Sequence, residues 1–494
     1  MKITNMSGLE IGRAVQDRVV TAKEVLDATF ARIEEANPKL NAFVYLKKDE
    51  AYKEAAAIDE MVMKHPERAK KYPLLGVPVG LKDFLPSYKG WTNSHGGLMA
   101  EEQVDSEFSE FTKAALELGA IPIGKTNCPE FAFRGTCDNY KYGPTHNPYD
   151  LEYNSGGSSG GSAAAVGGHL VPISEGSDGG GSIRIPASWC NCFGFKPSVG
   201  LVPSVCRPDG WTATHPYCFN GCITRTVDDS AVLFKKMAHF DPKDPLSIPI
   251  KTAHNFLDII HESIKGMKIA YTSDFGMFNH TAPMEQVTRS AAHVFEKLGA
   301  TVDYDIDFTF THTANSYADM WCEAICVDTC TDLYMQTLEK YDTHKYTDDM
   351  EGLPATIDYW HEAVAKSDVY GYRAFNIMRT EIYDQLEKAL DKYDLILSPV
   401  TTCPPVKNAK EKGQTFGPAY VNGVPSNTII GFCETFLTNF TGHPSASVPA
   451  GFIGGLPVGL QIIGNRWHDS DVFKAAYNYE RATSVSHNAA KIVM

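Results

Sequence analysis

The sequence predicts an α/β protein built on a substantial β-sheet, and three observations support this prediction. First, a helix, a glycine and a short apolar strand follow one another twice, over residues 111–123 and 287–302. Second, other short apolar segments are separated by stretches with helical periodicity, which is typical of a sheet covered by helices. Third, 494 residues with 43% hydrophobic and 21% charged side chains are sufficient for a large globular core.

The first predicted elements lead up to a lysine. Thr21 and Glu24 have the spacing of a capping box, so we expect a helix to begin there and to end at Asn37-Pro38. Residues 74–81 form a short apolar segment typical of a strand, in which Pro78 indicates a sheet edge or a strand start. This segment runs directly into Lys82-Asp83, so we expect a lysine at the end of the strand.

The two helix–glycine–strand units come next. Gly119 and Gly299 each follow a helical stretch, at the position just after a helix end where glycine is favoured. A strand is expected after each glycine, at 120–123 and 300–302. Three further strands are expected at 268–271, 395–397 and 458–463.

Composition and charge exclude several classes of protein. The chain carries 45 Lys and Arg against 60 Asp and Glu, a net charge of −15, which argues against a nucleic-acid binder. No apolar run approaches the roughly 20 residues of a membrane span, and residues 1–7 lack the apolar region of a secretion signal. We therefore expect a cytoplasmic protein that binds neither nucleic acid nor membrane.

Most of the twelve cysteines are expected to be free thiols, because the cytoplasm keeps cysteines reduced. Cys322, Cys326 and Cys330 recur every four residues on one helical face, which favours small buried apolar side chains. Cys190 and Cys192 are too close together for an ordinary zinc half-site, and the sequence contains no His-Glu-x-x-His motif. No metal site is predicted.

Residues 155–162 are all glycine or serine. Taken alone, such a segment is compatible with a flexible linker. However, Ala163-Ala-Ala-Val166 follows at once, which favours a packed helix. A Gly/Ser loop that opens a helix presents free N–H groups, and these favour an anion or a developing negative charge.

A second glycine-rich loop follows at 177–186. The N–H groups of Gly179, Gly180 and Gly181 could line an oxyanion pocket beside Ser182. A phosphate-binding loop is excluded because no Gly-Lys-Ser/Thr ends either glycine run. The Gly-x-Ser-x-Gly elbow does not fit around Ser182, because Arg184 stands where the last glycine would be. No histidine stands out as a base. Lys82 is a candidate if it is buried, because desolvation lowers the pKa of a lysine, although most lysines are solvated.

Three segments resemble the signature of the amidase signature family, and shorter matches extend over nearly the whole chain. The resemblance implies a single large domain over 1–494, with a mixed, many-stranded sheet surrounded by helices. It places the core motif at 155–198 and a variable substrate-pocket region at about 305–372. The three signature segments are 156–165, 176–187 and 194–198, and the shorter matches are 31–43, 75–83, 124–127, 441–451 and 455–464.

The resemblance also implies roles for individual residues. Ser182 is the expected nucleophile, Ser158 the bridging serine after a cis peptide bond, and Lys82 the base of a Ser–Ser–Lys triad. Asp178 and Arg184 are expected to pair and brace the oxyanion loop. The remaining implied site residues are Gly179, Gly180, Gly181 and Ser182 as oxyanion donors, Ser159 and Ser177 as supports, and Ala132 and Phe133 as substrate contacts.

The implied function is hydrolysis of a small carboxylic amide through an acyl-enzyme, without metal or cofactor, and the resemblance also suggests a homodimer. Similarity extends to the 6-aminohexanoate cyclic-dimer hydrolases of this family. One alternative is the glutaminase (A) subunit of a tRNA-dependent amidotransferase, although residues 209–219 lack the Ser-Leu-Asp-Gln stretch typical of that subunit. The other alternative is a catalytically silent binding protein on the same fold.

The variable region is rich in aromatic residues. These side chains either line an apolar acyl pocket or belong to the ordinary core, and the sequence leaves both interpretations open. They are Trp321, Tyr334, Tyr341, Tyr346, Tyr359 and Trp360.

Overall fold

An eleven-stranded mixed sheet runs through the protein in the computed structural model. The structure describes residues 2–84, 87–97, 104–207, 209–212, 214–249, 255–304, 306–325 and 368–483. The sheet has the strand order β1-β3-β2-β6-β8-β7-β14-β15-β11-β9-β10. Its strands are β1 (Phe43–Leu46), β2 (Pro78–Lys82), β3 (Ile121–Thr126), β6 (Ile173–Asp178), β7 (Phe193–Lys196), β8 (Phe219–Thr224), β9 (Lys268–Tyr271), β10 (Thr301–Tyr304), β11 (Leu395–Pro399), β14 (Ser445–Ile453) and β15 (Leu456–Gly464).

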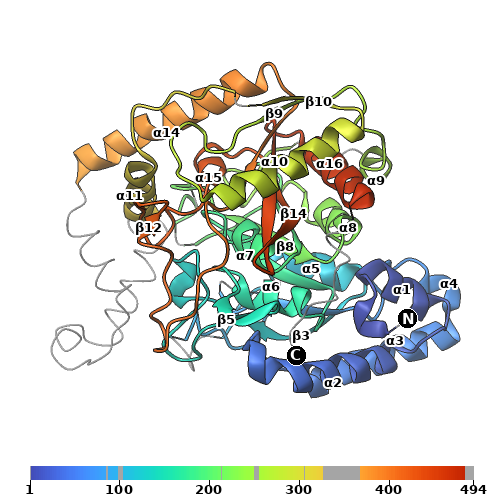
Figure 1. Cartoon of the computed structure of the whole chain (residues 1–494). Helices are drawn as coiled ribbons and strands as arrows, with labels where there is room; N and C mark the ends of the chain where they lie inside the picture. Colours follow the sequence, from blue (N-terminus) through green and yellow to red (C-terminus); the bar gives the residue numbers. More distant parts are fainter. Residues whose placement is uncertain are drawn as a thin grey trace.

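Helices surround this sheet, with α2 and α3 along one side of the molecule and α10 and α14 on the opposite side (Figure 1). Two short hairpins lie outside the main sheet, β4 (His146–Asn147) with β5 (Asp150–Asn154) and β12 (Tyr420–Val421) with β13 (Val424–Pro425). The α-helices are α1 (Gly8–Gln16), α2 (Ala22–Leu40), α3 (Lys48–Lys64), α4 (Pro66–Ala69), α5 (Glu110–Glu117), α6 (Gly160–Gly167), α7 (Arg184–Trp189), α8 (Val227–Met237), α9 (Phe256–Ile259), α10 (Ala282–Lys297), α11 (Ala314–Ala324), α14 (Val369–Leu390), α15 (Leu437–Thr441) and α16 (Asp469–Ala482), with 3-10 turns at η1 (Ile3–Asn5) and η2 (Glu130–Ala132).

The predicted α/β class and mixed sheet are confirmed. Strand β2 pairs in parallel with both β3 and β6, whereas β6 pairs antiparallel with β8. Both helix–glycine–strand units are present, and Gly119 and Gly299 adopt φ values of +91° and +92° after α5 and α10. These left-handed conformations explain why glycine ends both helices.

Two prolines lie near the ends of their elements. The capping box at Thr21 and Glu24 is present, but the predicted helix end at Asn37-Pro38 is wrong, because α2 continues to Leu40. A proline in the last turn removes only one helical N–H bond, and the helix stops instead at Asn41, which is left-handed. Pro78 is the first residue of β2, so it marks a strand start and not a sheet edge.

The register of the central strands positions the candidate site. Gly80 of β2 pairs with Ser174 of β6 in parallel, so both strands end at the same edge of the sheet, with β6 two residues longer. Lys82 ends β2 and Asp178 ends β6. The fully buried helix α6 packs against these strands, so its first turn lies near the same strand ends.

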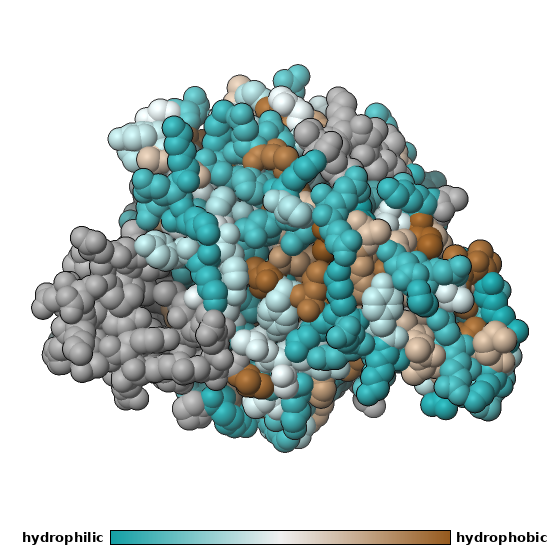
Figure 2. Space-filling view, turned by 90° about the horizontal axis from the view of Figure 1, so that it is seen from below, coloured by the Kyte–Doolittle hydropathy of each residue, from teal (hydrophilic) through white to brown (hydrophobic). Residues whose placement is uncertain are grey.

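The surface is mostly hydrophilic on the face seen in Figure 2, where apolar side chains form only small separate groups. Within the described residues, no helix is both long and apolar enough to cross a lipid bilayer. The ten cysteines in these residues are all free thiols. Cys322 is buried on α11 as expected, whereas Cys326 and Cys330 lie outside the described residues.

Candidate active site

Lys82 is the last residue of β2, and its side chain is buried. Its Nζ donates to Ser158 Oγ at 2.6 Å and to Ser177 Oγ at 2.9 Å. Its peptide N–H donates to Glu175 Oε2 at 3.1 Å. The end of the strand therefore holds the amine against two of the predicted site serines.

Burial changes the acid–base chemistry of this amine. Removal from water disfavours the charged form and lowers the pKa of Lys82 from 10.5 to about 8. At pH 7, about a tenth of the molecules then carry a neutral amine at this position. Because a neutral amine accepts a proton, Lys82 is able to act as a base near neutral pH.

The Gly/Ser segment 155–162 is part of the buried core, so its interpretation as a flexible linker is wrong. The Gly157–Ser158 peptide bond is cis, which confirms the expectation from the resemblance. Glycine is required at 157 because a Cβ there would overlap the backbone of Thr136. The chain is thus packed closely where it presents Ser158 to Lys82.

Ser182 lies in the turn between β6 and α7, with 7% of its surface exposed. Its carbonyl accepts a hydrogen bond from the Ser159 N–H at 3.1 Å, and Ser159 Oγ donates to the Ser177 carbonyl at 3.3 Å. These bonds tie the two serine-containing loops together. Among the described residues, the Ser182 hydroxyl has no hydrogen-bond partner, which leaves it available to a ligand.

All four carbonyl groups of residues 178–181 accept a hydrogen bond. In a planar peptide group, C=O and N–H point in opposite directions, so a bond to one carbonyl also orients the N–H of the next residue. The donors to carbonyls 178, 179, 180 and 181 are, in turn, Asn439 Nδ2 at 3.0 Å, Trp321 Nε1 at 2.8 Å, Thr435 Oγ1 at 2.6 Å and the Ile185 N–H at 2.7 Å.

The N–H groups of this loop are used unevenly. The Gly181 N–H donates to Asp178 Oδ1 at 2.7 Å, so it is already engaged. In the part of the chain that the structure describes, the N–H groups of Gly179, Gly180 and Ser182 have no partner. Unpaired backbone donors are unfavourable inside a folded protein, and three of them within four residues indicate a place for a ligand oxygen. Two of the three glycines predicted as donors are therefore available.

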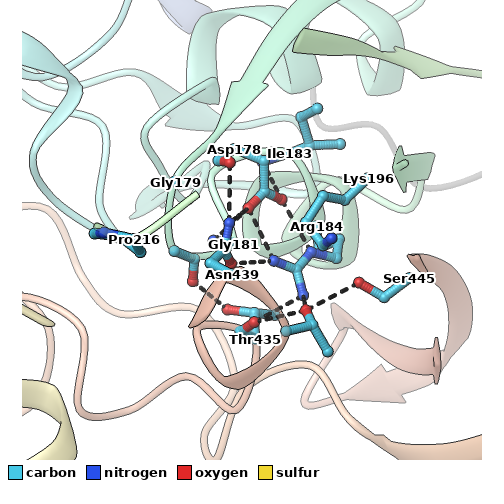
Figure 3. A network of polar contacts seen from close by, with 12 residues as sticks. Asp178, Gly179, Gly181, Ile183, Arg184, Lys196, Pro216, Thr435, Asn439 and Ser445 are labelled. Atoms are coloured by element: carbon cyan, nitrogen blue, oxygen red, sulfur yellow. Dashed lines mark hydrogen bonds and ion pairs between the residues drawn. The ribbon is translucent and has the colours of Figure 1, made fainter. Parts of the chain in front are cut away.

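Asp178 and Arg184 form a buried ion pair, which confirms their predicted pairing (Figure 3). Arg184 donates to both carboxylate oxygens of Asp178, from Nη2 at 2.8 Å and from Nε at 2.9 Å. Burial alone would raise the pKa of Asp178, but the charge and hydrogen bonds of Arg184 outweigh it and lower the pKa to about 2. The Asp178 carboxylate is thus charged at neutral pH and also holds the Gly181 and Ile183 N–H groups.

Ala132 and Phe133 lie at the end of η2, where Phe131 and Ala132 both have left-handed φ values of 48° and 57°. Ala132 is half-buried and Phe133 is buried. The Phe133 ring stacks on Trp321, with centroids 5.7 Å apart and planes inclined by 24°. Since Trp321 also donates to the Gly179 carbonyl, Phe133 belongs to the layer directly behind the glycine loop.

Sequence reasoning missed the residues that hold the loop from outside the signature. Thr435 and Asn439 come from the α15 segment, just before the resembling stretch that begins at Thr441. Trp321 stands out in the sequence only as one aromatic residue of the variable region, and its hydrogen bond to the loop leaves no local signal. The other five aromatic residues that the sequence analysis named there lie outside the described residues.

The site combines a buried lysine that is bonded to a serine with three unpaired backbone N–H groups. Such a combination favours acyl transfer from a carbonyl compound. The fold and the site thus define a hydrolase that acts on acyl groups. The family model described as Amidase matches residues 24–473, and the chain belongs to this family. It is accordingly a hydrolase of amide C–N bonds.

Known proteins resemble the chain over nearly its full length. A solved bacterial aryl acylamidase of the amidase signature family is 38% identical, covers 98% of both chains and has a TM-score of 0.91. An acylamidase of Rhodococcus erythropolis is 29% identical over 96% of this chain and 95% of its own length. The glutamyl-tRNA(Gln) amidotransferase (A) subunit of Geobacillus thermodenitrificans is 32% identical over 96% of both. The structure of 6-aminohexanoate cyclic dimer hydrolase, at 23% identity and a TM-score of 0.80, shares the fold.

Proposed function

We propose that the protein is an acylamidase in which Ser182, Ser158 and Lys82 form a catalytic triad. The observation that carries this proposal is the 2.6 Å hydrogen bond between Lys82 Nζ and Ser158 Oγ in a buried site. Two further features support it. Burial brings the pKa of Lys82 to about 8, and the Ser159 N–H bond to the Ser182 carbonyl keeps the two serine loops together.

The reaction proceeds in two halves. Neutral Lys82 accepts the proton of Ser158, which accepts the proton of Ser182, and Ser182 Oγ forms a bond to the amide carbonyl carbon. As the tetrahedral intermediate collapses, the C–N bond breaks and the proton returns through Ser158 to the leaving nitrogen. Water then attacks the acyl-enzyme through the same relay and releases the carboxylic acid.

The negative charge on the carbonyl oxygen is held by the N–H groups of Gly179, Gly180 and Ser182. Their lack of partners among the described residues supports this role. Gly181 contributes by its left-handed backbone, at φ +125°, and by its bond to Asp178. The remaining supports are Ser159 and Ser177, which bond the loops to each other and to Lys82, and Arg184, which fixes Asp178.

The substrate that we propose is the amide of an aromatic amine or acid. A bacterial aryl acylamidase shares 38% identity and the fold with this chain. Aromatic side chains also lie near the site, because Phe133 stacks on Trp321 behind the glycine loop and the Phe84 ring centroid lies 5.5 Å from Lys82 Nζ. On this proposal Ala132 contacts the substrate, and Phe133 supports the wall of the site from behind through Trp321.

A second candidate is the glutaminase subunit of an amidotransferase. It is favoured by the 32% identity to the Geobacillus thermodenitrificans protein over 96% of both chains. It predicts hydrolysis of glutamine and dependence on partner subunits. However, the Ser-Leu-Asp-Gln stretch typical of the glutaminase subunit is missing from residues 209–219, and this absence favours the acylamidase.

A hydrolysis screen with mass-spectrometric detection tests the proposal. The panel contains p-nitroacetanilide, short aliphatic amides, a carbamate, glutamine and linear and cyclic aminohexanoate oligomers. We expect the wild type to cleave the anilide and Ser182→Ala to be inactive, while the exposed Ser290→Ala retains full activity as a matched serine control. Cleavage of glutamine alone would favour the glutaminase, and equal activity of Ser182→Ala would refute the triad.

A further inference from the structure

One peptide of the glycine loop is held by a residue far outside the signature. Trp321 Nε1 on α11 donates to the Gly179 carbonyl at 2.8 Å. The indole also packs against the next residue, because a Cβ built on Gly180 would lie 2.7 Å from Trp321 Cζ2. The ring is 2% exposed, so it is part of the packed structure around the loop.

The bond from Trp321 has a consequence for the unpaired N–H of Gly180. The Gly179 carbonyl and the Gly180 N–H belong to one planar group and point in opposite directions. Glycines on both sides allow this plane to rotate more freely than in other sequences. A hydrogen bond that fixes the carbonyl therefore fixes the direction of the N–H.

The neighbouring peptide planes do not depend on α11. Thr435 holds the Gly180 carbonyl and the Asp178 carboxylate holds the Gly181 N–H, so the following peptide is fixed at both ends. Asn439 holds the Asp178 carbonyl. Among the described residues, Trp321 makes the one hydrogen bond to the 179–180 peptide, and its indole also packs on Gly180, while Cys218 and Ile325 lie near Gly179.

We propose that Trp321 is a positioning residue for catalysis, which orients the Gly180 N–H toward the developing oxyanion. This inference rests on the proposed function of the site. Trp321 does not touch the reacting atoms on this view, and it acts through the Gly179–Gly180 peptide. Loss of its N–H should leave substrate binding nearly intact and weaken stabilisation of the transition state.

The position of α11 itself is set by segments from the C-terminal part of the chain. Asn315 Nδ2 donates to the Pro425 carbonyl at 2.7 Å, and Asn427 Nδ2 donates to Asp319 Oδ1 at 2.6 Å. Tyr317 donates to Glu381 of α14. The orientation of a catalytic N–H thus depends on how α11 is seated against α14 and the β12–β13 hairpin.

The test compares Trp321→Phe with Trp91→Phe as a matched control. Both tryptophans are nearly buried, both donate one hydrogen bond of 2.8 Å, and both stack on an aromatic ring, Trp91 on Tyr88. Trp91 donates to Glu50 of α3, and within the described part of the chain it has no hydrogen bond to the glycine loop. The control therefore reports the loss of an indole and its bond without a change at the site.

We expect kcat for p-nitroacetanilide to fall by about 10- to 100-fold in Trp321→Phe, with KM within about twofold of the wild type. The affinity for a trifluoromethyl ketone, which forms an oxyanion adduct with Ser182, should fall in parallel with kcat/KM. Trp91→Phe should keep both values. A kcat equal to that of Trp91→Phe, or a rise in KM alone, would overturn the inference.

A second variant covers the case in which Trp321→Phe does not fold. Replacement of Trp321 by 3-benzothienylalanine keeps the ring shape and removes only the N–H. The same decrease in kcat supports the inference, and wild-type kcat overturns it. If the wild type itself hydrolyses no amide in the panel, the proposed function fails, which is distinct from failure of the role of Trp321.

Discussion

The pH dependence of the reaction tests whether Lys82 is the base. Burial lowers the pKa of Lys82 to about 8, so the neutral fraction of this amine is about one half at pH 8 and about one hundredth at pH 6. If acylation needs the neutral amine, kcat/KM should decrease about 50-fold between these pH values. The amine remains able to accept a proton above pH 8, where the rate should reach a plateau.

The assay measures kcat/KM for p-nitroacetanilide from pH 5.5 to 9.5. This substrate is uncharged over the range, so the titration belongs to the free enzyme. Lys82→Met serves as the control and should show a low residual rate without the inflection near pH 8. A decrease of less than about threefold between pH 8 and pH 6 in the wild type would refute Lys82 as the base.

A second variant checks the assignment of the inflection. The Glu175 carboxylate accepts the Lys82 peptide N–H. Burial raises the pKa of Glu175 itself to about 7, so this group is mostly charged at pH 8, where its charge raises the pKa of Lys82 against the effect of burial. Glu175→Gln removes this charge, so the inflection should move to lower pH. Movement to higher pH, or no movement, would assign the inflection to a group other than Lys82.

Three further outcomes are expected. Asp178→Asn leaves the buried Arg184 without its charge partner, so the free energy of unfolding measured by urea titration should fall by about 3–5 kcal/mol. A loss below about 1 kcal/mol would contradict the bracing role of this ion pair. Gly181→Ala should reduce kcat/KM by about 100-fold or more without changing the circular dichroism spectrum. The reason is that φ of residue 181 is +125° and the new Cβ would overlap Thr435 Oγ1. Near-normal activity would show that the loop tolerates displacement. The folded pKa of Lys82 lies below its unfolded value, so the unfolded state binds more protons between about pH 8 and 10.5. The free energy of unfolding of the wild type should therefore increase relative to that of Lys82→Met as the pH rises through this window. Parallel stability curves for the two proteins would contradict burial of the amine.

Sequence reasoning succeeded where the signal is local. The capping box at Thr21 and Glu24 needs only neighbouring residues, and the glycines after α5 and α10 reflect a single left-handed residue each. For Lys82 the local pattern predicted only a lysine at the end of a strand, and its role as a base came from the resemblance, because most lysines are solvated. The predicted end of α2 is wrong for a related reason, since a proline in the last turn of a helix costs little and the actual stop is Asn41.

Other features depend on contacts between distant segments, and the sequence alone does not reveal them. The order of the eleven strands joins β6 to β8 and β14 to β7 through crossovers that no local pattern encodes. Likewise, nothing near Trp321 indicates that its indole bonds to Gly179. The motif predicted which groups form the glycine loop, while their direction is determined by tertiary packing.

The glycine loop therefore has two separate sources of order. The signature supplies the reactive groups and one internal brace, in which Asp178 holds the Gly181 N–H and Arg184. On the proposed function, Asn439 of α15 and Trp321 of α11 supply the bonds that orient the Gly179 and Gly180 N–H groups toward a bound carbonyl. Since glycine gives each peptide plane little resistance to rotation, these outer bonds matter more here than in an ordinary loop. A substitution on α11 should consequently alter turnover even when every residue of the triad is intact.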